Sequence, residues 1–327
     1  VMSLKPSEKP PSFVPVNGIK PQILKNVCEK KTYTAHFWDG PGPLVICLHG
    51  FPDSCLSYHL LIPELVEAGY RVLVPVMPGY EASSVDPEGR YFPTDLAQNL
   101  VSWIDRVGEE RAHLIGHDWG AVTAWFVAAR YPDRLFSMSS IAIPSLPGGL
   151  KALLKRPSQF LKSWYMLFFQ IRGLAEWSLQ AKDGALVKAL WRRWSPGWQA
   201  PEQLLDAVLE SLQSADSRTA VLAYYRCLFN VFDAEHGRAM KALKTRISVP
   251  TLMVCGDRDG CIDTRLFEYS LREQDFSAPV ELYRIMGAGH FCHLEKPQLF
   301  HSKLLSFLDL HPKGARKLAG ELARHMG

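Results

Sequence analysis

The chain has 327 residues, of which 47% are hydrophobic and 21% charged, as in an ordinary water-soluble globular protein. Its length suits one large domain with an inserted subdomain, because single hydrophobic cores stop growing near roughly 250–300 residues. The formal net charge of +4 comes from 37 basic and 33 acidic residues spread along the chain, which argues against a nucleic-acid partner. The segment 311–326 is locally basic, and we interpret it as a solvated surface helix.

The seven cysteines form an odd set without a CxxC pair, so the sequence suggests neither a disulfide framework nor a zinc site. Residues 1–16 lack the apolar region of a secretion signal, and no run approaches the ~20 apolar residues that span a bilayer. We therefore expect a cytoplasmic monomer or homodimer without a transmembrane segment, a metal or another cofactor.

Apolar runs alternate with helical patterns as far as residue 143, an arrangement that predicts a parallel sheet with helices on both faces. The pattern over 93–107 has an apolar stripe at helical spacing, with Thr94 as the expected cap. Short runs of apolar and β-branched residues, as expected for strands buried on both faces, lie at 44–48, 71–75, 112–116 and 135–143.

This alternation stops at Pro144. From 146 to about 234 there is only helical patterning, rich in tryptophan, before strand patterns resume at 251–255 and 280–285 and a closing helix follows. We predict a core made of residues 1–145 and 235–327, with 1–16 as an extended arm, and a helical lid formed by 146–234.

The motif GHDWG (116–120) stands between a predicted strand and a predicted helix. It has the spacing of the GxSxG nucleophile elbow, with Asp118 at the position of the serine. Flanking glycines let the strand and the helix approach each other while the middle side chain projects above the sheet. A loop aspartate that caps the next helix is the alternative. Because the strand, both glycines and the helix occur together, we favour Asp118 as a nucleophile.

An HG pair (49–50) directly follows the first of the buried strands. Such a pair commonly precedes the second oxyanion donor of a nucleophile elbow. The backbone N–H groups of Phe51 and Trp119 are then expected to face the Asp118 oxygen that becomes an oxyanion. We interpret His49 as a residue that orients this loop and not as one that transfers protons.

A nucleophile elbow needs an acid and then a histidine later in the chain. Asp259 and His290 each follow one of the two late strands, at the edge where such sites form. We predict Asp259 as the acid and His290 as the base. Asp257, Asp263 and His293 are close enough in sequence to be rivals, although the two aspartates also suit turns.

Four motifs, HGFPDS (49–54), GHDWG (116–120), GDRD (256–259) and GAGH (287–290), occur in this order around the tryptophan-rich insertion. Over about residues 16–310 the chain thereby resembles the α/β-hydrolase-fold epoxide hydrolases of the soluble type, without an N-terminal phosphatase domain. The resemblance implies an α/β-hydrolase fold, with a mostly parallel central sheet flanked by helices and an inserted helical cap.

The resemblance also implies an enzyme that opens lipophilic epoxides to vicinal diols. Enzymes of this family attack an epoxide carbon with the elbow aspartate, here Asp118, and hydrolyse the ester with water that a histidine activates, here His290. Two lid tyrosines bind the epoxide oxygen. The segments SWY (163–165) and AYYR (223–226) carry these roles to Tyr165 and Tyr225, with Tyr224 as the rival. A phenol suits the role because it can donate a hydrogen bond or a proton to an alkoxide.

The expected partners are a small-molecule epoxide and water. Phe168, Phe169 and Trp177 are candidates for an apolar pocket, which favours lipophilic substrates. Detoxification and lipid-epoxide processing both remain open as the physiological role.

Two other functions compete with this hypothesis. A haloalkane-type dehalogenase also uses an elbow aspartate, and Trp119 suits a halide donor. Phe51, however, stands where dehalogenases usually offer a second halide donor, and the tyrosine pair favours an alkoxide. The other alternative is a catalytically inactive hydrolase-fold binding protein, against which the complete set of candidate residues argues. A serine esterase is excluded because Asp118 occupies the elbow.

Overall fold

The computed structural model of the chain describes residues 13, 15–16, 18–28 and 30–311. Almost all of the expected N-terminal arm (1–16) and of the expected basic tail helix (311–326) lies outside these residues. No helix in the described ranges is long and apolar enough to cross a membrane.

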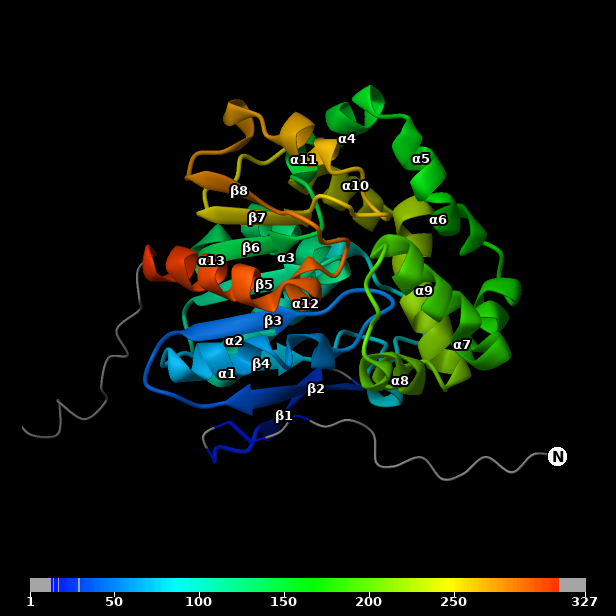
Figure 1. Cartoon of the computed structure of the whole chain (residues 1–327). Coiled ribbons are helices and arrows are strands. Elements are labelled where there is room, and N and C mark those ends of the chain that lie inside the picture. The colour runs from blue at the N-terminus through cyan, green and yellow to red at the C-terminus, as the bar shows by residue number, and fades with distance from the viewer. Residues whose placement is uncertain (1–12, 14, 17, 29, 312–327) are drawn as a thin grey trace, which may run out of the picture.

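In the described chain, eight strands form one sheet in the order β1-β2-β4-β3-β5-β6-β7-β8 (Figure 1). The pairs β1–β2 and β2–β4 are antiparallel, and all other neighbouring pairs are parallel. The sheet is therefore mostly parallel, which confirms the predicted fold class. The strands are β1 (Gln22–Cys28), β2 (Lys31–Trp38), β3 (Leu44–Leu48), β4 (Arg71–Pro75), β5 (Ala112–His117), β6 (Leu135–Ile141), β7 (Thr251–Gly256) and β8 (Val280–Ile285).

Five of the predicted strands form the centre of this sheet as β3, β4, β5, β6 and β7, and the strand predicted at 280–285 is the edge strand β8. Every residue of β3, β4, β5 and β7 is buried, as expected for strands covered on both faces. β6 ends at Ile141, two residues before the predicted end. The reason is local, because Ala142 has a φ of 63°, which does not continue an extended strand.

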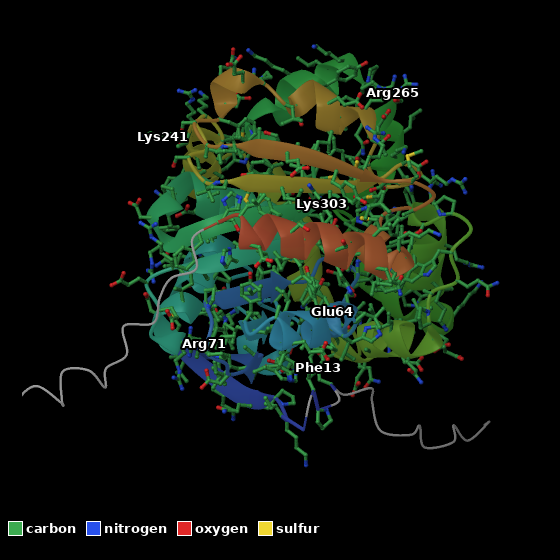
Figure 2. All side chains as sticks on the ribbon, turned by 60° about the vertical axis from the view of Figure 1, so that its left-hand side comes forward. Phe13, Glu64, Arg71, Lys241, Arg265 and Lys303 are labelled. Atoms are coloured by element: carbon green, nitrogen blue, oxygen red, sulfur yellow. The ribbon has the colours of Figure 1, made fainter. Side chains whose placement is uncertain are left out.

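Helices cover both faces of the sheet (Figure 1). α1 (Leu61–Glu67) contacts α13 (Pro297–Asp309) on one face, next to α12 (Cys292–Glu295). Figure 2 brings this face forward, with Glu64 on α1 and Lys303 on α13. On the other face α2 (Pro93–Val107) contacts α3 (Trp119–Arg130), and α10 (Ala234–Ala242) contacts both. Short 3₁₀ turns lie at Cys55–Tyr58, Ala82–Ser84, Pro132–Arg134 and Glu273–Asp275.

The prediction that Thr94 is the N-terminal capping residue of α2 is wrong. The helix begins at Pro93 with Phe92 in the capping position, so Thr94 lies inside the first turn. Its hydroxyl donates to Glu235 at 2.9 Å instead of capping the helix. The helix has the predicted bounds 93–107, and proline suits its first position because its fixed φ is helical and its missing N–H costs nothing there.

Between β6 and β7 the described chain contains helices and no strand before residue 247. α7 is bent at 181–184, where the backbone leaves helical geometry, and it packs on α8 and α9. The helices α4 to α9 lie to the right of the strands in Figure 1, and we call them the cap. The predicted boundaries at 146 and 234 stay predictions. The helices are α4 (Leu146–Lys155), α5 (Ser158–Lys162), α6 (Trp164–Phe168), α7 (Leu174–Trp194), α8 (Glu202–Ser211) and α9 (Ala215–Phe229); α11 (Arg265–Ser270), in the core, packs on α4.

Candidate active site

Asp118 lies in a sharp turn between β5 and α3. Its φ of 49° and ψ of −116° form a strained conformation for a residue with a side chain. Two glycines make the turn possible: a Cβ on Gly116 would lie 2.3 Å from the carbonyl oxygen of Gly120, and one on Gly120 would lie 2.1 Å from that of Leu48. Although Asp118 occupies the capping position of α3, its carboxylate makes no capping hydrogen bond. The geometry is that of a nucleophile elbow and not of a helix cap.

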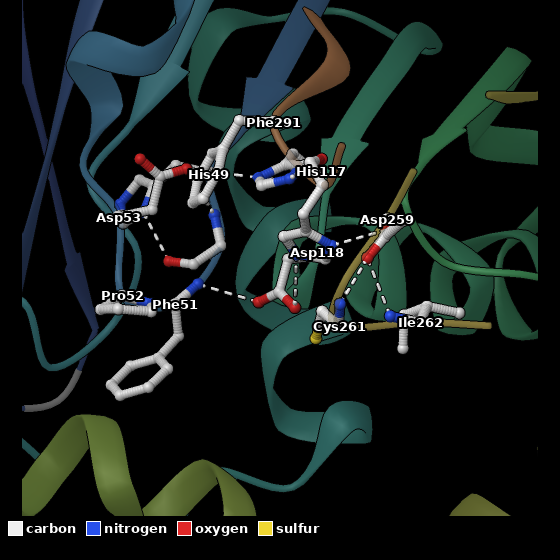
Figure 3. A network of polar contacts seen from close by, with 12 residues as sticks. His49, Phe51, Pro52, Asp53, His117, Asp118, Asp259, Cys261, Ile262 and Phe291 are labelled. Carbon is white, nitrogen blue, oxygen red and sulfur yellow. Dashed lines mark hydrogen bonds and ion pairs between the residues drawn. The ribbon is translucent and has the colours of Figure 1, made fainter. Parts of the chain in front are cut away.

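The loop after β3 lies against the Asp118 carboxylate (Figure 3). The N–H of Phe51 donates to Oδ1 of Asp118 at 2.9 Å. Gly50 permits this approach, because a Cβ there would lie 2.4 Å from the Cβ of Asp118. The N–H of Trp119, the second expected donor, makes no hydrogen bond to this carboxylate within the described residues. One of the two expected donors thus already faces the carboxylate, and the oxyanion role of both N–H groups stays a prediction.

The structure brings Asp259 and His290 together behind Asp118. Nδ1 of His290 lies 2.9 Å from Oδ2 of Asp259, and its Nε2 lies 3.6 Å from Oδ2 of Asp118. The other oxygen of Asp259 accepts the N–H groups of Cys261 at 2.7 Å and Ile262 at 2.8 Å, as Figure 3 shows. These bonds fix the carboxylate that orients the imidazole. All three side chains are buried.

The rivals lie elsewhere. Asp257 accepts the N–H of Gly287 at 2.6 Å in a turn, and Asp263 forms an ion pair with Arg156. His293 is buried against the ring of Tyr58, and neither of its ring nitrogens has a hydrogen-bond partner in the described chain. None of these three side chains bonds to His290 or Asp118.

The two carboxylates determine the charge of His290. Burial disfavours the imidazolium, but the Asp259 carboxylate, together with Asp118, outweighs burial and raises the pKa of His290 to about 10. At neutral pH the ring is therefore protonated and lies between two anions. Loss of the Asp118 charge would remove part of this stabilisation and lower the pKa.

Two phenols from the cap meet above the elbow. The rings of Tyr165 and Tyr225 lie 5.8 Å apart and nearly perpendicular. The hydroxyl of Tyr165 lies 3.4 Å from Sγ of Cys261, and the buried hydroxyl of Tyr225 makes no hydrogen bond of ordinary geometry with the described residues. Burial raises the pKa of both phenols well above its ordinary value, and at Tyr225 the Trp119 side chain acts in the opposite direction.

Tyr224 points away from these phenols. Its hydroxyl donates to the carbonyl oxygen of Pro78 at 2.6 Å, and its ring stacks on Tyr91 at 5.2 Å. These contacts give Tyr224 a packing role, whereas the buried hydroxyl of Tyr225 has no hydrogen-bond partner among the described residues. The geometry therefore favours Tyr225 over Tyr224 as the second tyrosine of the site.

The expected pocket residues divide into three cases. Phe169 is fully buried, with its ring 5.4 Å from Phe51 and 5.1 Å from Tyr225, so it adjoins the site. Phe168 is half-buried beside Trp164. Trp177 is 63% exposed and does not line the site, because the first turn of α7 directs it outwards. A cavity of about 790 Å³ between the β1–β2 hairpin and α2 contains none of the candidate residues.

His49 holds the loop that carries Phe51. The N–H of Met77 donates to its Nε2 at 3.1 Å, which leaves the proton on Nδ1, and Nδ1 donates to the carbonyl oxygen of Gly50 at 3.1 Å. Burial lowers its pKa, so the ring stays neutral. These contacts fit an orienting residue.

A second buried Asp–His pair, not anticipated from the sequence, lies under the elbow. Nδ1 of His117 lies 3.3 Å from Asp53, and its Nε2 lies 3.1 Å from the backbone carbonyl of His290. Burial disfavours the Asp53 charge, but bonds from His117 and Ser57 outweigh it and hold the pKa of Asp53 below its ordinary value. The pair connects the loop after β3 to the loop of the base. In the sequence, this pair is marked only by the presence of Asp53 in HGFPDS and of His117 in GHDWG.

The C-terminal end of α7 connects the loop of Asp259 to the loop of His290. The sequence did not indicate this connection. The carbonyl oxygen of Trp194 accepts the N–H of both Gly260 and His290. The hydroxyl of Ser195 accepts the N–H of Phe291 and donates to Glu295 at 2.6 Å. The cap therefore holds the loop of His290 through the carbonyl oxygen of Trp194 and the hydroxyl of Ser195.

The donor types in the described ranges do not suggest a metal centre. No group of three or more His, Cys, Asp or Glu side chains there is arranged to hold an ion. All seven cysteines are free thiols. The chemistry available at the elbow is that of a carboxylate, an imidazole and two phenols.

Comparison with known proteins agrees with this geometry. The family described as "alpha/beta hydrolase fold" matches residues 43–297. Epoxide hydrolase A of Mycobacterium tuberculosis is 31% identical over 307 residues, which cover 82% of this chain and 91% of that protein. Bifunctional epoxide hydrolase 2 of Sus scrofa is 35% identical over 323 residues, covering 90% of this chain and 57% of the longer protein. The crystal structure of Epoxide Hydrolase A from Mycobacterium thermoresistibile has a TM-score of 0.72 at 26% identity, covering 90% of this chain and 99% of that one.

Proposed function

Because this chain belongs to the α/β-hydrolase fold family, on its epoxide hydrolase branch, we propose that it opens epoxides to vicinal diols with Asp118 as the nucleophile. One observation carries the proposal: Asp118 lies in a strained elbow between the Phe51 N–H on one side and the His290–Asp259 pair on the other. The buried hydroxyls of Tyr165 and Tyr225 supply donors for an oxygen above it.

In the first step, Oδ2 of Asp118 attacks an epoxide carbon and the carbon–oxygen bond of the ring breaks. Oδ2 is the available oxygen, since Oδ1 accepts the N–H of Phe51. The ring oxygen leaves as an alkoxide that stays on the substrate and takes a proton from Tyr165 or Tyr225. The donors therefore act on charge that develops in the transition state.

The proton balance explains the protonated histidine. A phenol that gives up its proton becomes a buried phenolate, which the raised pKa values of Tyr165 and Tyr225 make unfavourable. The imidazolium of His290 is a proton source within the site. Esterification of Asp118 removes the charge that helped to hold this proton. His290 gives this proton to the phenolate, which restores the tyrosine, and becomes neutral, which is the form that a general base needs.

In the second step, neutral His290 takes a proton from water, and the hydroxide attacks Cγ of the Asp118 ester. The Phe51 N–H stabilises the resulting oxyanion on Oδ1, with Trp119 as the expected second donor. Collapse breaks the ester bond and gives the diol alkoxide and a protonated Asp118. Proton transfer between them releases the diol and restores the carboxylate, while the imidazolium was already restored when His290 took the proton from water. The sum is epoxide plus water giving diol.

Two substrates distinguish the alternatives. The protein is incubated separately with styrene oxide and with a bromoalkane, and diol and bromide are measured. Diol from the epoxide without bromide release is the expected result. Efficient bromide release with no diol would identify a dehalogenase, and neither product would favour a binding protein.

A further inference from the structure

The outer surface of the cap concentrates large apolar side chains. Among the described residues, eight of the twenty exposed large apolar side chains lie between positions 154 and 177. Such concentrations typically mark contact with another protein or with a membrane. Six of them form what we call the cap apolar face: Phe160, Leu161, Trp164, Leu167, Ile171 and Trp177.

The face occupies one side of consecutive short helices. Its residues belong to α5, α6, the turn after α6 and the first turn of α7. In the same stretch Tyr165, Phe169 and Ala175 are buried, so this stretch presents one apolar side to the protein and another to solvent. In Figure 1, α5 and α6 lie at the outer margin of the cap, away from the sheet.

The surroundings of the face are positively charged. Between residues 146 and 177 the chain has five Lys or Arg and one acidic residue, Glu176, which forms an ion pair with Arg226. Arg156 pairs with a carboxylate of the core, and Lys162 donates to backbone carbonyls after β7. The other three, Lys151, Lys155 and Arg172, are exposed and form no ion pair with the described residues.

This composition distinguishes between possible occupants of the face. Exposed Trp, Phe and Leu beside Lys and Arg match the interfacial region of a bilayer with anionic headgroups. A second copy of the chain would bring the same positive charges towards each other, which opposes association. We propose that the cap apolar face docks onto an anionic phospholipid bilayer.

Docking would bring lipid close to the site. Trp164 of the face and Tyr165 of the site are adjacent residues of α6. If the proposed function holds, the bilayer would be the source from which lipophilic epoxides enter; this consequence rests on the proposed function. The docking itself depends only on the surface.

The test is flotation of the full chain with lipid vesicles in the absence of epoxide. Vesicles of phosphatidylcholine with roughly 30 mol% phosphatidylserine are compared with pure phosphatidylcholine, and added salt near ~0.5 M screens the charges. We expect binding to the anionic vesicles, weaker binding in salt and little binding to the neutral ones. Leu161→Gln with Leu167→Gln should weaken binding on the order of tenfold or more, because both side chains are exposed and apolar.

A second pair and a control make the test specific. Lys151→Glu with Lys155→Glu should abolish the preference for phosphatidylserine. Val27→Gln removes an equally exposed apolar side chain, at 69%, from β1 at the far edge of the sheet and should bind as the parent does. Circular dichroism checks that each variant is folded, and if the leucine pair fails to fold, the lysine pair decides.

Three results would overturn the proposal: no binding to either vesicle, binding that neither pair weakens, or a dimer that the leucine variants dissociate while vesicles stay unbound. Diol formation from styrene oxide without vesicles is measured in parallel. Lost vesicle binding with unchanged diol formation supports docking as a separate property. Vesicle binding by a protein that forms no diol would refute the proposed function and leave docking supported.

Discussion

Nε2 of His290 lies 3.6 Å from Oδ2 of Asp118, which is close enough for charge attraction but beyond hydrogen-bond reach. The same imidazole is held at 2.9 Å by Asp259 on its other side. The imidazole is therefore held by Asp259 and not by Asp118. This leaves Oδ2 of Asp118 free of a hydrogen bond from His290, as the proposed attack on a substrate carbon requires.

The tyrosines provide the first prediction, because the proposed mechanism places them in ring opening and not in ester hydrolysis. Tyr165→Phe and Tyr225→Phe should each slow alkylation about 10- to 1000-fold, the loss expected for one oxyanion-type hydrogen bond. Rapid-quench measurement of ester formation tests this. Tyr224→Phe is the matched control: it loses the bond to Pro78 at a cost of about 1 kcal/mol in stability but should keep the alkylation rate. The reverse pattern would assign the role to Tyr224.

A second prediction concerns the acid. Asp259→Asn should slow ester hydrolysis more than ester formation, because it misorients the imidazole and removes the charge that stabilises its protonated form. The alkyl-enzyme should then accumulate in single-turnover experiments. Asp257→Asn, two residues away in a turn, should behave like the parent. Equal defects in the two variants would count against Asp259 as the orienting acid.

The raised pKa of His290 predicts how stability depends on pH. A histidine titrates near 6.5 in the unfolded chain but at about 10 in the folded protein. Its contribution is fully present below pH 6.5 and is lost as pH rises to about 10, by at most ~1.4 kcal/mol per unit. The stability difference between the parent and His290→Gln should thus shrink over this window in urea unfolding. A difference independent of pH would contradict a protonated imidazole.

The link between the cap and the base loop can be tested at Ser195. Ser195→Ala leaves the Phe291 N–H without an acceptor and removes one of the two donors to the half-buried Glu295, which keeps the N–H of Gly289, so the free energy of unfolding should fall by ~1–3 kcal/mol. Ester hydrolysis should slow more than ester formation. Ser178→Ala on the same helix loses only a bond to the carbonyl of Ala175 and serves as the control. Similar stabilities of the two variants would refute the link.

The central strands could be predicted because burial on both faces leaves uninterrupted apolar runs in the sequence. β1 could not be identified in this way, since most of its residues are exposed and its sequence QILKNVC has no such run. The positions of Asp118, Asp259 and His290 after strands also follow from the sequence, because parallel strands end at one edge of a sheet. The choice between Tyr224 and Tyr225 does not, since neighbouring helical residues differ by about 100° in direction and only packing decides which faces the site.

Contacts between residues far apart in the sequence could not be predicted for similar reasons. The Ser195–Glu295 bond joins residues 100 positions apart, and no local pattern marks either of them. The outward direction of Trp177 likewise depends on how α7 is placed on the core. Motif spacing therefore predicts the groups that do chemistry, while the residues that hold them in place require the structure.

The most direct test of the account is to trap the covalent intermediate. His290→Gln should still form the ester, because the aspartate and both tyrosines remain, although more slowly, because the imidazolium proton is lost; it should fail to hydrolyse the ester. After incubation with styrene oxide, peptide mass spectrometry should find the adduct on the peptide that contains Asp118, and it should be absent when Asp118 is also changed to Asn. An adduct on another residue, or continued diol formation with no adduct on Asp118, would contradict the assignment of Asp118 as the nucleophile.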